Sequence, residues 1–136
     1  DYFILSNRYK NLGLTLPEGS PERVEAANNG IKYIDLALES AANKGPLYRN
    51  KATLLMVRDG ANNTPELIET YQAMIAAYDE DPENLTKYSD AYKTAYTRMG
   101  SYYMGQDDKE KAREYFQKVL DIDPENESVK KVLSEL

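Results

Sequence analysis

The chain has 136 residues, of which 41% are hydrophobic and 29% are charged, a composition typical of one folded domain. Its formal net charge of −6 argues against nucleic-acid binding, which depends on Lys and Arg neutralising phosphates. Because Cys and His are both absent, disulfides and thiolate metal sites are excluded, and the commonest general base of enzymes is missing.

The spacing of apolar residues predicts an all-α protein. These residues recur at intervals of three and four and never alternate strictly, so no strands are expected. The expected helices, in chain order, cover residues 2–13, 21–43, 47–58, 65–79, 86–104, 108–121 and 126–135. The longest aliphatic run, residues 54–57, is too short to span a membrane, so no membrane insertion is expected.

Short motifs mark where helices start. Ser-Pro-Glu at 20–22 and Thr-Pro-Glu at 64–66 each place a capping hydroxyl before a proline. Asp-Pro-Glu-Asn occurs at 81–84 and again at 123–126, and we interpret each copy as the end of one helix whose Asp caps the next. A calcium loop beginning at Asp79 is the alternative, but Asn84 stands where such a loop needs Gly. No metal site and no cofactor are therefore expected.

Residues 93–126 resemble a tetratricopeptide repeat (TPR), a helix–turn–helix unit of about 34 residues. Gly100 and Ala112 are small at the point where the two helices of such a unit cross, and bulky side chains surround them. The residues that match the family's pattern at its spacing are Tyr96, Met99, Gly100, Tyr103, Ala112, Phe116 and Pro124.

Weaker matches extend the resemblance over most of the chain, as units at 1–44, 45–84 and 85–126 followed by a capping helix at 127–136. The resemblance implies a single domain over 1–136, a right-handed α-α superhelix of about three helix pairs with one continuous core. The two Asp-Pro-Glu-Asn copies lie 42 positions apart, against about 34 residues in a family unit. The difference places an insertion at 85–92, which predicts two extra turns on the helix that follows.

In this family the first helix of each unit lines a concave groove. The resemblance therefore implies a protein-interaction scaffold that binds an extended peptide or partner segment without catalysis. Some members hold a terminal carboxylate there, and Lys10, Asn50 and Arg98 stand at three of the five positions that do so, whereas Leu14 and Thr94 depart from that pattern. A solvated polar face without a ligand is the alternative. The implied groove residues are Lys10, Asn11, Arg49, Asn50, Thr53, Thr97, Arg98 and Ser101.

Tyrosine is the one unusual bias, with twelve residues and no tryptophan. Tyr96 and Tyr103 fall at packing positions of the family, so we expect them in the core. Tyr88 and Tyr92 fall on the insertion and are candidates for an exposed aromatic contact surface, because tyrosine is enriched at protein interfaces.

No catalytic activity is expected. Carboxylate pairs such as Asp107 and Asp108 fall in a predicted turn, and no His or Cys can form a nucleophile–base pair. The rival to the scaffold is a structural spacer that self-associates through its terminal helices and has no groove ligand. Because the chain begins at Asp1 rather than Met, a longer precursor and an exported location are expected, with a cytoplasmic location left open.

Overall fold

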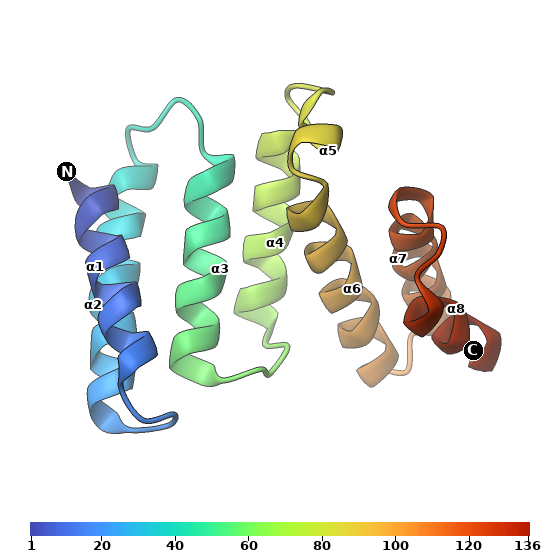
Figure 1. The fold of residues 1–136 in the computed structure, drawn as a ribbon, viewed down its shortest axis with the longest axis horizontal. Helices are drawn as coiled ribbons and strands as arrows, with labels where there is room; N and C mark the ends of the chain where they lie inside the picture. The colour runs from blue at the N-terminus through green and yellow to red at the C-terminus, as the bar shows by residue number, and fades with distance from the viewer. The chain divides into compact units, whose positions relative to one another are not determined.

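The computed structural model describes residues 1–136, which form eight α-helices and no strands (Figure 1). Within the described contacts most helices pack against a neighbour in the chain, consistent with a helical repeat, so the all-α prediction is confirmed. None of the helices combines the length and the apolar composition needed to cross a membrane. The helices are α1 (Tyr2–Thr15), α2 (Pro21–Leu38), α3 (Gly45–Asp59), α4 (Pro65–Tyr78), α5 (Asn84–Lys87), α6 (Ser89–Gly105), α7 (Lys109–Ile122) and α8 (Glu127–Glu135).

The chain divides into two compact units. The first unit comprises Asp1–Asn62 with Glu69–Ala77, and the second comprises Asn63–Ile68 with Tyr78–Leu136. The first unit therefore contains α1, α2, α3 and most of α4, whereas the second contains α5 to α8. The expected division into three helix pairs with one continuous core stays a prediction.

In the first unit, glycine allows α2 to approach α3 closely. A Cβ atom at Gly30 would lie 2.5 Å from Cδ2 of Leu54, so no larger residue fits without displacing Leu54. The Arg23 guanidinium donates hydrogen bonds to the carbonyl oxygens of Gly13 at 3.2 Å, Leu16 at 3.1 Å and Val57 at 3.1 Å. Arg23 thus connects the ends of α1 and α3 to the start of α2, and satisfies carbonyl groups that helix ends leave open.

The second unit is built around an apolar cluster between α6, α7 and α8. Phe116 packs so closely on Gly100 that a Cβ atom there would lie 2.8 Å from the ring. Asp107 adopts a left-handed φ of 58° in the turn between α6 and α7, a conformation that Asp tolerates better than most residues. The buried members of the cluster are Ala112, Phe116, Val119 and Val129, and those half-buried against it are Tyr96, Tyr103, Leu120, Val132, Leu133 and Leu136.

The local sequence pattern predicted the starts of two helices correctly and the end of one incorrectly. The Ser20 and Thr64 hydroxyls accept hydrogen bonds from backbone N–H groups, of Arg23 and Leu67 respectively, each at 3.2 Å, so both predicted caps are confirmed. The predicted helix at 21–43 is too long, because α2 ends at Leu38. Residues 39–44 contribute no buried side chain, and a helix gains most of its stability from a packed face.

The Asp-Pro-Glu-Asn copies each follow the end of a helix as predicted, but neither Asp caps a following helix. In each copy the Asn N–H donates to the Asp carbonyl, at 3.0 Å in 81–84 and 3.1 Å in 123–126. This closes a turn, because Asp at the first position and Pro at the second favour a β-turn. The next helices begin later, at Asn84 in the first copy and after the cap residue Asn126 in the second.

The insertion at 85–92 differs from the predicted extension of one helix. It contains the single-turn helix α5 and the first turn of α6, which are separated at Tyr88, where φ is −119° and ψ is 34°. The prediction of two uninterrupted extra turns is therefore wrong. Nothing in the spacing of the apolar residues marks this break, since the Tyr88 and Tyr92 spacing also fits a continuous helix.

Candidate functional site

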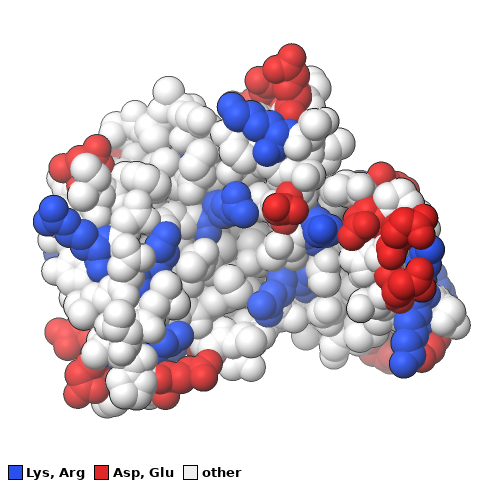
Figure 2. Space-filling model, in the orientation of Figure 1, with Lys and Arg blue, Asp and Glu red and all other residues white.

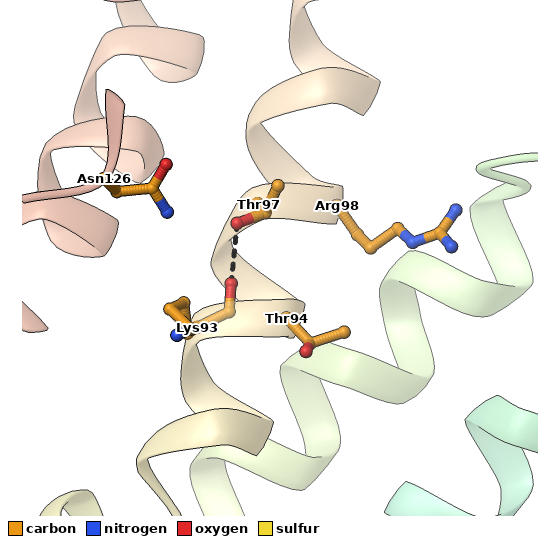
Figure 3. A pocket seen from close by; sticks show the side chains of 5 residues that line it. All are labelled: Lys93, Thr94, Thr97, Arg98 and Asn126. Atoms are coloured by element: carbon orange, nitrogen blue, oxygen red, sulfur yellow. Dashed lines mark hydrogen bonds between the residues drawn. The ribbon is translucent and has the colours of Figure 1, made fainter. Parts of the chain in front are cut away.

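A pocket of about 210 Å³ opens on the polar side of α6 in the second unit. Figure 3 shows that four of its lining side chains come from α6 and that Asn126 faces them from the start of α8. The helical period places the α6 residues on one face, since they recur at intervals of three and four. The pocket is lined by Lys93, Thr94, Thr97, Arg98 and Asn126.

Hydrogen bonds orient several of these side chains. The Thr97 hydroxyl donates to the carbonyl oxygen of Lys93 at 2.8 Å, one turn earlier on α6 (Figure 3). Arg98 Nη1 donates to Oδ1 of Asn63 at 3.3 Å. Asn126 Oδ1 accepts from the Val129 N–H at 3.1 Å, which is its capping bond. Local helix bonds therefore orient Thr97 and Asn126, and a tertiary bond to Asn63 orients Arg98.

The pocket lining is polar and includes two cationic side chains, Lys93 and Arg98. All five lining side chains carry hydrogen-bond donors, and none is a carboxylate. Lys93 Nζ lies 3.5 Å from Asp123 Oδ2 and 4.0 Å from Asp90 Oδ1, in a partly exposed position. Ion pairs as exposed as these contribute little to stability. On the face shown in Figure 2, Lys and Arg occur among Asp and Glu and do not form one continuous basic patch.

The structure brings together only part of the predicted groove in this unit. Of the groove residues predicted on α6, Thr97 and Arg98 line the pocket, whereas Ser101 is half-buried and does not; their role in binding stays a prediction. Lys93 and Thr94, which belong to the pocket, follow from extending the Thr97 and Arg98 face by one turn toward the start of α6. Asn126 was missed as a site residue. The sequence did contain a clue to it, because Asn126 is the last residue of the second Asp-Pro-Glu-Asn copy.

In the first unit, two predicted groove residues form an internal polar link between α1 and α3. Lys10 Nζ donates to Asn50 Oδ1 at 2.8 Å, and Asn50 Nδ2 donates to Ser6 Oγ at 2.9 Å. The Ser6 hydroxyl in turn donates to the Phe3 carbonyl at 2.7 Å. Asn50 is 6% exposed and Ser6 is fully buried, so the Asn50 amide is used within the protein.

Lys10 is partly buried, whereas the other predicted groove residues of the first unit do not share one site. Burial lowers the pKa of the Lys10 ammonium, because removing the charge from water disfavours it. Asn11 and Arg49 are exposed, and the Thr53 hydroxyl donates to the Arg49 carbonyl at 3.3 Å. These residues do not line a described pocket, so in this unit the structure gathers only Lys10 and Asn50.

The predicted aromatic surface is wrong for Tyr92. Its side chain is only 1% exposed, and its hydroxyl donates to Asp79 Oδ1 at 2.7 Å. Burial above all, with the bond to Asp79, raises the pKa of the Tyr92 hydroxyl. Tyr88 is half-buried and stacks on Tyr78, with ring centroids 4.5 Å apart. The ring of Tyr92 is turned inward because Tyr78 and Tyr96 provide aromatic partners within about 6 Å.

No part of residues 1–136 gathers three or more Asp or Glu side chains in an arrangement that could hold a metal ion. Asp81, in the first Asp-Pro-Glu-Asn copy, uses its carboxylate to accept the Glu83 N–H at 3.1 Å. In the same copy, the Asn84 amide donates to the Tyr78 carbonyl at 2.9 Å. These side chains therefore stabilise the turn after α4.

Residues 93–126 match the family model of the tetratricopeptide repeat. The matched segment begins at Lys93 in α6, includes α7 and ends at Asn126, so it contains the whole pocket lining. Comparison with curated proteins and with solved structures finds no match. The family match at 93–126, together with the all-helical fold, fits a protein of the tetratricopeptide repeat family.

Proposed function

We propose that this protein is a non-catalytic interaction scaffold that binds an extended, acidic peptide segment of a partner protein in the pocket on α6. Tetratricopeptide repeats are generally protein–protein interaction modules and typically lack catalytic activity, and residues 93–126 match this family. The proposal adds the position of the site and the chemistry of the ligand.

One observation carries the proposal: five donor side chains and no carboxylate line a pocket in a chain of net charge −6. An ammonium and a guanidinium group attract a carboxylate, and hydrogen bonds to charged groups are stronger than those between neutral groups. Thr94, Thr97 and Asn126 add neutral polar groups that can hold the backbone of an extended peptide. Affinity should fall as salt concentration rises, because the pocket is open to solvent.

The experiment selects peptides from a random display library against the intact chain and measures their affinity by fluorescence anisotropy. The selected peptides should be acidic. Thr94→Glu places a negative charge in the pocket from an exposed position and should weaken binding about tenfold or more. Thr86→Glu is the matched control, because Thr86 is exposed on α5 and does not line the pocket.

Equal effects of Thr94→Glu and Thr86→Glu would contradict the proposed site. The rival function, a self-associating spacer, gives a different result. A spacer should yield no selected peptide and should sediment as a concentration-dependent oligomer. Analytical ultracentrifugation of the same preparation therefore distinguishes the two functions.

A further inference from the structure

A second cleft, of about 360 Å³, lies between α1 and α2 in the first unit. Its α1 side consists of Tyr9 and Leu12, three residues apart on one side of the helix, together with Leu16, the extended residue that follows α1. Leu12 leaves 48% of its surface exposed, although a leucine in contact with water gains nothing from that position. Ala26 of α2 is small and buried, and forms part of the cleft lining.

The α2 side of this cleft is acidic and polar. It consists of Glu22, Glu25 and Asn29. Both carboxylates are exposed, and neither belongs to any ion pair of the structure. Glu22 lies in the first turn of α2, where the helix dipole stabilises a negative charge. Glu25 lies further along the helix and gains little from the dipole.

This cleft is not the surface through which α2 packs on α3. Arg23 donates to the Val57 carbonyl of α3, and Gly30 lies against Leu54 of α3. On a helical wheel, Glu25 lies about 160° from Arg23 and about 140° from Gly30. Glu25 therefore lies on a different side of α2 from the contacts with α3, and Glu22 lies nearer to them, about 80° from Gly30.

We propose that the cleft binds an amphipathic helix of a partner protein, whose apolar row is bordered by Lys or Arg. Tyr9 and Leu12 on α1, with Leu16 just after the helix, offer apolar contacts to the anchor residues that a docked helix presents at i, i+3 or i+4 and i+7. The parallel row of unpaired carboxylates on α2 selects a partner with positive charge beside its apolar face. This site differs from the α6 pocket in place, in ligand charge and in ligand conformation.

The test uses two synthetic helical peptides with the same leucine pattern, one bordered by Lys and Arg and the other by Glu. Binding of each to the intact chain is measured by isothermal titration calorimetry. We expect the basic peptide to bind at least about tenfold more tightly than the acidic one. Leu12→Asp should weaken binding of the basic peptide by about tenfold or more, and the double variant Glu22→Gln/Glu25→Gln should weaken it and reduce its salt dependence.

Leu14→Asp is the matched control, because Leu14 is on the same helix, is 54% exposed and does not line the cleft. Its effect should stay within about twofold. Thr94→Glu should leave binding of the basic peptide unchanged, so failure of this proposal is distinguishable from failure of the α6 pocket. Equal affinity for both peptides, or equal effects of Leu12→Asp and Leu14→Asp, would overturn the proposal. Dimerisation of the chain that Leu12→Asp abolishes would also overturn it, since a second copy would then be the occupant.

Discussion

The two units use polar helix residues in different ways. In the first unit, Lys10, Asn50 and Ser6 are joined by hydrogen bonds, and Asn50 is buried. In the second unit, Thr97 and Arg98 line a pocket above an apolar cluster centred on Phe116. The comparison indicates that a position implied by the family resemblance does not by itself define a binding residue, because a polar side chain there can bond within the protein.

The largest expected effect concerns the apolar cluster of the second unit. Phe116→Ala removes a side chain that is 2% exposed and leaves a cavity beside Gly100, so it should lower the free energy of unfolding by about 3–5 kcal/mol. Urea unfolding followed by circular dichroism measures this loss. A loss as small as that of a surface substitution would show that this cluster does not hold the unit together.

A smaller loss is expected from the polar link of the first unit. Asn50→Ala removes the acceptor for Lys10 and one partner of the buried Ser6 hydroxyl, which should cost about 1–3 kcal/mol. Peptide affinity at the α6 pocket should not change. Thr53→Ala, in the same helix, is the control and should change stability by no more than about 0.5 kcal/mol. If Asn50→Ala abolishes peptide binding while stability is retained, the contrast between the units is wrong.

Arg98→Glu should have the opposite effect to Asn50→Ala, because it should weaken peptide binding more than it lowers stability. Reversing the charge that lines the pocket should weaken binding of a selected acidic peptide about tenfold or more, with a smaller effect on the free energy of unfolding than Phe116→Ala has. Fluorescence anisotropy and urea unfolding on one preparation separate the two effects. Lys131→Glu reverses an exposed charge that does not line the pocket and should leave affinity within about twofold of the original protein.

The smallest effect is expected from the pH dependence of Tyr92. Burial raises the pKa of this hydroxyl in the folded state, so above about pH 10 the unfolded state loses the proton first. The contribution of Tyr92 to stability is complete below that pH and declines above it, by at most about 1.4 kcal/mol per pH unit. Tyr92→Phe should therefore flatten the fall in unfolding free energy between about pH 9.5 and 11. If the unfolding free energy falls equally steeply with pH in the original protein and in Tyr92→Phe, a buried, protonated Tyr92 is contradicted.

The sequence predicted the helices where local chemistry determines them. Ser20 and Thr64 cap α2 and α4 because a hydroxyl before a proline suffices to start a helix. The end of α2 at Leu38 and the break at Tyr88 depend on whether a segment finds a surface to pack against, which propensity does not contain. The segments 81–84 and 123–126 each follow a helix as predicted. Each closes a turn through a backbone hydrogen bond, so the next helix starts later than at the predicted Asp cap.

The candidate site was predictable only in part, because some of its residues come together from distant positions in the sequence. Thr97 and Arg98 follow from the family spacing, since both lie in the first helix of the segment that matches the family, 93–126. Asn50 sits 44 positions from Ser6, and no local pattern shows that the two side chains bond. Asn126 enters the pocket from the start of α8, so its role depends on tertiary structure.

The central claim is that the α6 pocket, and not the polar link of the first unit, binds the partner peptide. The most direct test is nuclear magnetic resonance mapping of backbone amides in the intact chain as a selected acidic peptide is added. The account predicts that the largest shift changes occur at Lys93, Thr94, Thr97 and Arg98, with little change at Lys10 and Asn50. Changes concentrated at Lys10 and Asn50, with α6 unaffected, would contradict it.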